Sequence, residues 1–247
     1  MSILSTLTTD NSIENEKDSL GGGYILDSGL YNHTVTMAYL NTAASGAIGL
    51  VLNLKDTNGK ELRQTLYLTS GDAKGRKNYY ERDGKKYYLP NFIIANSLAL
   101  LTVGKEISEL DTEEKVVNVY SSEAKAEVPT KVDVVMDLLG KEIITGVVRQ
   151  IVDKTAKADN GQYLPTGETR EENEIDKFFR ASDRKTTTEI RAEVEEARFI
   201  DSWKEKFEGQ IRDKSTKGGA AGKVGSPRTA AANAVSSTKK PTQSLFA

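Results

Sequence analysis

The stretch of sequence that decides the fold runs from Ala47 to Leu68 and reads AIGLVLNLKDTNGKELRQTLYL. Leucine returns at every second position before the central polar break, and leucines again fall at even spacings after it. A period of two is typical of a strand that buries one face, and Asn-Gly between two such runs is a strong signal for a tight hairpin turn. The sequence therefore predicts antiparallel strands at residues 47–55 and 61–68, joined at Asp56–Gly59.

A third strand precedes this hairpin, because residues 30–40 also alternate. One face of that strand carries Tyr31, His33, Val35, Met37 and Tyr39. Within the hairpin, the side chains expected to point inward are Leu50, Leu52, Leu54, Leu62, Leu66 and Leu68. The side chains expected on the outer face are then Val51, Asn53, Lys55, Arg63, Thr65 and Tyr67.

A helix follows the three strands. It is expected to begin at Pro90-Asn91 and to run to Val103, since Gly104 is a helix stop signal. Its residues are apolar nearly all round, which predicts burial on most sides. The later elements expected from the pattern are strands at 116–120, 141–152 and 174–180, a short helix at 132–139, a hairpin partner at 185–191 and an amphipathic helix at 193–208.

Three meandering strands, a buried helix and two more strands give the order β-β-β-α-β-β. This is the order of the OB-fold, a five-stranded barrel that binds oligonucleotides and oligosaccharides. The predicted fold class is therefore a β-barrel with helices (α+β). In it, the buried helix lies between strands three and four, and a C-terminal helix follows the barrel. The barrel domain is expected to span residues 24–213.

Both ends of the chain have a different composition from the middle. Residues 1–23 are polar and end in three glycines, which predicts a flexible arm. Residues 214–247 consist largely of Gly, Ala, Ser, Thr, Lys and Pro and lack apolar periodicity, so a disordered basic tail is expected there. The tail closes with the apolar residues Leu245 and Phe246, which we expect to contact a partner protein.

Composition excludes several classes of protein. The chain has no cysteine, which rules out a disulfide scaffold, a zinc–thiolate site and a cysteine nucleophile. We expect no signal peptide, because residues 1–10 lack a basic segment before an apolar stretch, and no apolar run of about 20 residues occurs in the sequence. A cytoplasmic protein without a membrane contact is therefore expected. The formal charge is −2, with 34 basic and 36 acidic residues. Any binding of nucleic acid must therefore come from a local basic patch.

Such a patch lies between Lys74 and Tyr88. It holds six basic residues against two acids, and four of the ten tyrosines of the chain. Cations neutralise phosphates, and aromatic rings stack on unpaired bases whatever their identity. Around a small hairpin at Asp83-Gly84, the expected single-strand contacts are Lys74, Arg76, Lys77, Tyr79, Tyr80, Arg82, Lys85, Lys86, Tyr87 and Tyr88.

The outer face of the central hairpin is a second candidate surface. Lys55, Arg63 and Tyr67 share that face and supply charge and stacking at the place where OB-folds hold oligonucleotides. The connection at residues 153–173 is a third candidate, because long loops are often functional. Its potential contacts are Lys154, Lys157, Tyr163 and Arg170.

Signals for catalysis are weak, and we expect a protein without enzymatic activity, metal or cofactor. His33 is the only histidine and lies on an apolar strand face, which is typical of a core residue. The segment from Gly71 to Gly75 lacks the Gly-Lys-Ser/Thr ending of a phosphate loop. The residues Asp111, Glu113, Glu114 and Lys115 leave a magnesium nuclease as a lesser hypothesis.

Six blocks stand out over roughly residues 20–210: Leu26–Tyr31, Leu66–Gly75, Lys85–Pro90, Asp111–Val117, Asp137–Lys141 and Thr166–Asn173. Together they resemble the single-stranded DNA-binding proteins of tailed bacteriophages. The resemblance implies an OB-fold, sequence-tolerant binding of single strands, and a role in phage DNA replication, recombination and repair. Phage or host replication proteins would then be partners of the tail. The alternative is a phage structural or host-interaction protein, such as an inhibitor, that uses the barrel to bind protein.

Overall fold

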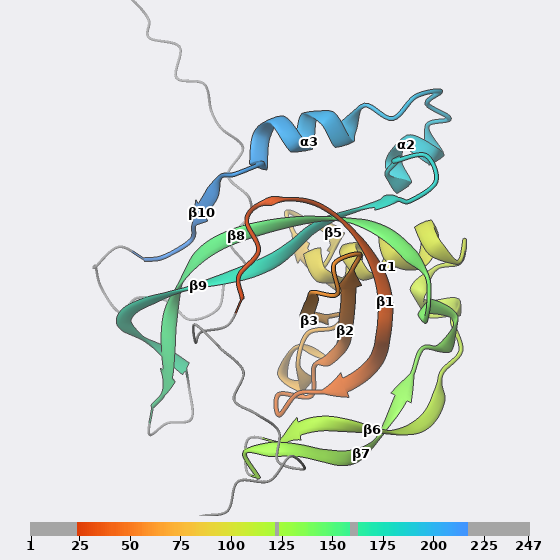
Figure 1. Ribbon diagram of the computed structural model, residues 1–247. Helices are drawn as coiled ribbons and strands as arrows, with labels where there is room; N and C mark the ends of the chain where they lie inside the picture. The colour runs from red at the N-terminus through yellow and green to blue at the C-terminus, as the bar shows by residue number, and fades with distance from the viewer. Residues whose placement is uncertain (1–23, 122–123, 159–162, 217–247) are drawn as a thin grey trace, which may run out of the picture. The chain divides into compact units, whose positions relative to one another are not determined.

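The predicted hairpin lies within a curved sheet. The computed structural model describes residues 24–121, 124–158 and 163–216. Three strands form the antiparallel meander: β1 (Gly29–Thr42), β2 (Ile48–Asp56) and β3 (Glu61–Tyr67) (Figure 1). In the β2–β3 turn, Gly59 has a φ of +82°, and the Asp56 carboxylate accepts hydrogen bonds from the backbone N–H groups of Asn58 and Lys60. The two strands and their turn are confirmed.

Eight strands make up this sheet. The remaining five are β6 (Glu113–Ser121), β7 (Ala126–Val134), β8 (Glu142–Lys157), β9 (Tyr163–Arg180) and β10 (Ile211–Asp213). The main path runs β10-β8-β1-β2-β3, with β9 on β8 and with β7 on both β1 and β6. All pairs are antiparallel except β10 with β8. Strands β4 (Tyr79–Arg82) and β5 (Lys85–Tyr88) form a separate two-stranded sheet.

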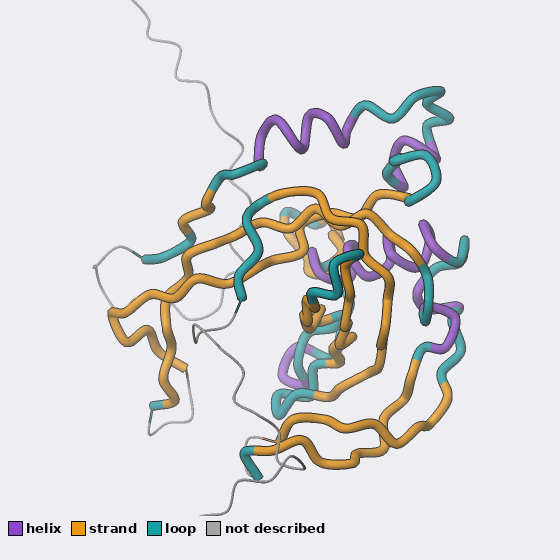
Figure 2. Tube along the Cα trace, in the orientation of Figure 1, coloured by secondary structure: helices purple, strands orange, loops and turns teal. Residues whose placement is uncertain are grey.

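Helices are few and short beside the strands, as Figure 2 shows. They are α1 (Pro90–Thr102), α2 (Thr187–Arg191) and α3 (Phe199–Phe207). Helix α1 begins at a proline, whose fixed φ suits the first helical position, and it confirms the predicted buried helix. No helix in the described part of the chain has the length and apolar character needed to cross a membrane.

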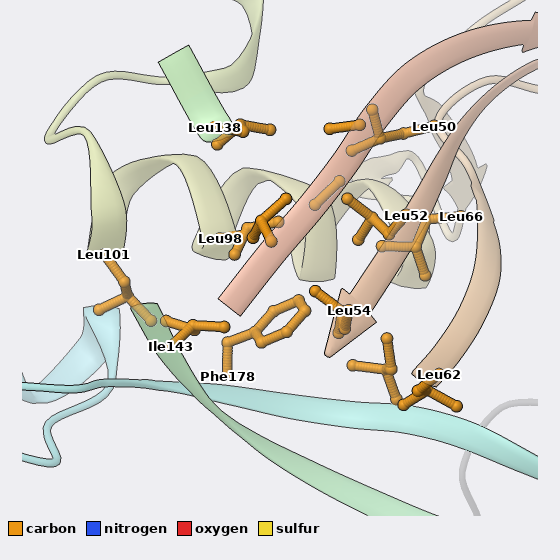
Figure 3. Close-up of a cluster of buried hydrophobic side chains, with 14 of the residues drawn as sticks. Leu50, Leu52, Leu54, Leu62, Leu66, Leu98, Leu101, Leu138, Ile143 and Phe178 are labelled. Carbon is orange, nitrogen blue, oxygen red and sulfur yellow. The ribbon is translucent and has the colours of Figure 1, made fainter. Parts of the chain in front are cut away.

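The main core lies between α1 and the concave face of the sheet (Figure 3). Its fully buried side chains include Leu50, Leu52, Leu54, Leu66, Leu98, Ile143 and Phe178. The inward leucines of the central hairpin are thus confirmed, with Leu68 partly buried at the margin. Each fully buried side chain of this size contributes about 1.5–3 kcal/mol, so this cluster holds α1 against the sheet.

A second cluster packs α3 on the opposite side of β8. Ile200 and Trp203 of α3 contact Ile144, Val148 and Phe179. The Trp203 indole lies against the backbone of Gly146, where a Cβ atom would come within 2.8 Å of the ring. The indole N–H also donates a 2.8 Å hydrogen bond to the Asp176 carboxylate. The predicted C-terminal helix is confirmed, although it begins at Phe199 rather than near residue 193.

A third cluster covers part of the outer face of the sheet. Tyr39 and Val51 pack against Val134 of β7. Val51 lies on the outer face, as predicted, but it is only 1% exposed because β7 covers it. A bulge between Val35 and Met37 shifts the alternation of β1, so Tyr39 joins this cluster while Val35 faces the main core.

Three further expectations are wrong. Residues 132–139 are not a helix: they form the end of β7 and a 3₁₀ turn at Met136–Leu138. The hairpin partner expected at 185–191 is absent, because α2 occupies Thr187–Arg191. The expected loop at 153–173 is largely a β-ribbon, because β8 and β9 stay paired as far as Lys157 and Tyr163. It runs out to the left in Figure 1.

The described strands do not form the closed barrel that the sequence predicts. No backbone ladder joins β3 to β9 within the described residues, and both are edge strands. The Gln64 side chain spans the seam between them, accepting a 2.7 Å hydrogen bond from the Ile175 backbone N–H. The predicted arm and the tail residues Leu245 and Phe246 lie outside the described part of the chain. Lys214, at the expected start of the tail, still donates a backbone hydrogen bond to Ile151.

Candidate nucleic-acid interface

The basic, tyrosine-rich segment folds as the hairpin β4–β5. Its two-residue turn consists of Asp83 and Gly84, with φ values of +52° and +71°. Positive φ at both positions is the requirement of the type I′ turn, which Asp-Gly satisfies well. The hairpin predicted at this site is therefore confirmed.

The strand pairing distributes the four tyrosines over both faces of the hairpin. Tyr80 lies opposite Tyr87, and Tyr79 lies opposite Tyr88. Directly opposed residues share a face and neighbours along a strand do not, so each face carries one pair. The rings of Tyr80 and Tyr87 stack with centroids 5.6 Å apart. If one face of the hairpin packs against the rest of the protein, the other face still presents a pair of tyrosines.

Ring surface stays accessible in this hairpin, and cations stand beside it. Tyr87 is 39% exposed and Tyr88 is 58% exposed, while Tyr79 and Tyr80 are half-buried. The ammonium groups of Lys77 and Lys86 lie 5.5 and 5.0 Å from the centre of the Tyr79 ring. The Arg82 guanidinium lies 5.9 Å from that of Tyr87. The hairpin thus offers rings for the bases and cations for the phosphates of a single strand at neighbouring positions.

The base of the hairpin is tied to α1. The Leu89 N–H donates a 2.8 Å hydrogen bond to the Asn78 carbonyl, closing the hairpin where the helix begins. The Tyr88 ring also lies 5.0 Å from the ring of Phe92 in the first turn of α1. Because α1 is part of the main core, the hairpin is presented from a rigid support.

The basic side chains differ in how free they are. Lys74, Arg76, Lys77, Arg82, Lys85 and Lys86 are all exposed. Arg76 is hydrogen-bonded to the Asp72 carboxylate, which raises the pKa of Arg76, and Arg82 lies 3.6 Å from the Asp83 carboxylate. The four lysines form no ion pair with any described residue. They are the groups most available to phosphate.

The second candidate surface, on β2 and β3, is smaller than expected because β7 covers Val51. Tyr67 is 44% exposed, and its ring lies along Gly49 of β2, the residue directly opposite. The Arg63 guanidinium donates a 2.9 Å hydrogen bond to the Tyr39 hydroxyl. Lys55 is exposed and lies opposite Glu61. This face offers one ring platform and two cations.

The structure keeps the predicted contacts in two groups. In the described part of the chain, no side-chain hydrogen bond, ion pair or ring contact links the hairpin to Lys55, Arg63 or Tyr67. On the β8–β9 ribbon, two of the candidate cations bond carboxylates: Lys154 to Glu168 at 2.9 Å and Arg170 to Glu172 at 3.0 Å. The hairpin is thus the strongest of the three candidate surfaces.

Sequence reasoning missed two residues at these sites. Phe92 extends the hairpin's aromatic surface into α1, and its place in the first turn after Tyr88 was a readable signal. Tyr39 holds Arg63 across the sheet, but the bulge in β1 conceals this from an alternating pattern. Neither residue stands out by composition.

The residues considered for catalysis are His33 and the acidic cluster that begins at Asp111. His33 is 3% exposed and its Nδ1 has no hydrogen-bond partner in the described structure. Burial lowers the pKa of His33, with Asp56 opposing that effect. Glu113 bonds to Lys115 and Glu114 to Lys131. No group of three His, Cys, Asp or Glu side chains with metal-binding geometry occurs among the described residues.

No family model and no curated protein matches the chain.

Proposed function

We propose that this protein binds single-stranded DNA with little sequence preference and covers it without catalysis. The observation that carries the proposal is the β4–β5 hairpin, where exposed tyrosine rings lie beside lysines that form no ion pair with any described residue. A base stacked on an aromatic side chain contributes about 1–3 kcal/mol, and every base offers a face for stacking. Cations beside the rings add a contribution that is independent of sequence and weakens with salt.

The strand order supports an OB-type barrel as the finer description of the fold. Five of the strands lie in the order β3-β2-β1-β8-β9, and α1 enters between β3 and β8 along the chain. This is the order of an OB barrel left open between its third and fifth strands. The resemblance to phage single-stranded DNA-binding proteins extends the proposal to phage DNA replication, recombination and repair.

Titration with oligo(dT) at several salt concentrations, with and without magnesium, tests the proposal. Binding of single strands changes log K by about −0.7 per phosphate contact for each unit of log salt. If the four hairpin lysines each meet a phosphate, a slope near −3 is expected. Absence of binding at low salt would contradict the proposal and favour a protein-binding role. Magnesium-dependent shortening of the DNA would point to the nuclease instead.

Two variants test the site. Replacing both Tyr87 and Tyr88 with alanine is expected to weaken binding by at least tenfold, about 1.4 kcal/mol, without changing the salt slope. Replacing Lys85 and Lys86 with glutamine is expected to make the slope shallower by about 1.4. Tyr120→Ala, at a tyrosine that is 56% exposed on β6, is the matched control. Equal effects of Tyr120→Ala and the hairpin variants would contradict the site.

A further inference from the structure

An open pocket of about 400 Å³ lies beside the foot of the hairpin. Its walls come from the ends of β1 and β2, from α1 and from the segments around residues 68–78 and 107–112. The apolar side chains that line it include Leu40, Ile48, Phe92, Ile107, Leu110 and Val135. Its volume falls within the range of pockets that hold small organic ligands, at the small end.

The charged side chains that line this pocket are all positive. Arg76 and Lys77 line it, and no carboxylate of the described residues does. The contact with Asp72 uses the Nε atom of Arg76, and the two terminal nitrogens of the guanidinium have no hydrogen bond to a described residue. A ligand of this pocket therefore combines an apolar body with a negative charge.

A second pocket, on the seam between β3 and β9, shows that this combination is not general. It measures about 580 Å³, and its lining mixes Arg63 and Arg170 with Glu61, Glu172 and Glu174. An anionic ligand gains little there, because the carboxylates offset the arginines. In the pocket at the hairpin, Asp72 pairs with Arg76 from outside the lining, and Lys77 forms no ion pair with a described residue, so an anion is favoured there.

An aromatic path connects the hairpin with the pocket. Tyr88 is exposed on the hairpin and contacts Phe92, and Phe92 lines the pocket. Lys77 lines the pocket and also stands over Tyr79. A DNA single strand that stacks on the hairpin therefore passes a cavity with an aromatic wall and two cations.

From these contacts we propose that the pocket takes up one unstacked nucleobase of the bound single strand, while Arg76 and Lys77 bind the adjoining phosphate. This inference rests on the proposed function and adds to it a specific place for one base. The base is held by apolar contact and by Phe92, so the pocket accepts bases without reading their hydrogen-bonding edges. A free nucleotide offers the same base and phosphate, and the test below distinguishes it from a base within a bound strand.

The test fills the pocket from its rim. Ser108 is exposed and lines the pocket, so Ser108→Trp adds a ring without removing a cation or a buried contact. Affinity is measured for oligo(dT) and for an abasic oligonucleotide of equal length. We expect Ser108→Trp to weaken oligo(dT) binding about tenfold, the loss of one stacked base, and to leave the abasic affinity unchanged. Thr112→Trp, at a second exposed lining residue, should behave alike.

Ser202→Trp, at an exposed position on α3 away from the lining, is the control and should change neither affinity. If both pocket variants bind oligo(dT) as the wild type does, the pocket does not hold a base, although the proposed function stands. An equal loss for the abasic oligonucleotide would also overturn the inference. Saturable binding of free thymidine monophosphate, blocked by Ser108→Trp while oligo(dT) binding is unaffected, would assign the pocket to free nucleotides. If the wild type binds neither oligonucleotide, the proposed function itself fails.

Discussion

Replacing Gly146 with alanine should loosen α3 from the sheet. The added Cβ would lie 2.8 and 2.9 Å from two atoms of the Trp203 ring, closer than carbon atoms approach without displacement. The ring has little room to move, because Trp203 is 2% exposed and its N–H is bonded to Asp176. Either the bond to Asp176 or the packing of α3 has to give way.

The size of the effect follows from two opposed contributions. Overpacking of a core typically costs about 1–3 kcal/mol. Exchanging glycine for alanine in extended backbone otherwise stabilises a protein by about 0.4–1 kcal/mol, because the unfolded chain loses freedom. A net loss of about 1–2 kcal/mol is expected, which lowers the Tm by about 2–4 °C per kcal/mol in a domain of this size.

Gly29 provides the matched control. It also lies in a paired strand, but a Cβ there would meet its nearest atom, in the Tyr31 ring, at 3.6 Å, an ordinary contact. Gly29→Ala should therefore be neutral or slightly stabilising. Urea unfolding followed by fluorescence suits the comparison, because Trp203 is the only tryptophan and should itself shift towards the emission of exposed indole. Equal stability of the two variants would refute the reasoning.

Three further predictions concern other parts of the molecule. His33 is the only histidine, and its lowered pKa means that the folded state binds a proton less readily than the unfolded chain. Stability should therefore fall as pH drops below about 6.5, by at most about 1.4 kcal/mol per unit, and urea unfolding of His33→Gln should lack this slope between pH 7.5 and 5.5. Glu189→Gln should destabilise the chain by about 1–3 kcal/mol in the same assay, since the buried carboxylate accepts hydrogen bonds from the N–H groups of Thr186, Arg198 and Phe199, and an amide nitrogen cannot accept any of them. Gly49→Val should displace the side chains of Thr65 and Tyr67, because a Cβ there would lie 2.8 Å from the Thr65 methyl carbon and 3.3 Å from the Tyr67 ring. It should reproduce any loss of oligonucleotide affinity seen in Tyr67→Ala; normal affinity in the first variant and reduced affinity in the second would argue against the ring platform.

Local sequence patterns predict an element correctly where a single rule determines its backbone conformation. The leucines of β2, the Asn-Gly turn and the Asp-Gly turn each have a single good solution, so those elements appear as expected. The β4–β5 hairpin and its tyrosines were predictable for the same reason. The pairing of Tyr80 with Tyr87 follows directly from the position of the turn.

Tertiary contacts decided the parts that the patterns missed. The bulge between Val35 and Met37 reverses the faces of β1 beyond it, and no residue type in that stretch announces it. Helix α2 is different, because Thr186 and Glu189 form a capping box whose spacing was visible in the sequence. The pocket at the hairpin also escapes sequence reasoning, since its walls come from segments far apart along the chain.

The seam bridged by Gln64 has a consequence for behaviour in concentrated solution. Two edge strands face it, and exposed strand edges invite other chains to add to the sheet and aggregate. Acidic and basic side chains occur together along the seam, Glu61 and Arg63 on β3 and Arg170 and Glu172 on β9. A second copy approaching this line would have to strip water from those charges, so the open side of the sheet is protected against fibre-like growth.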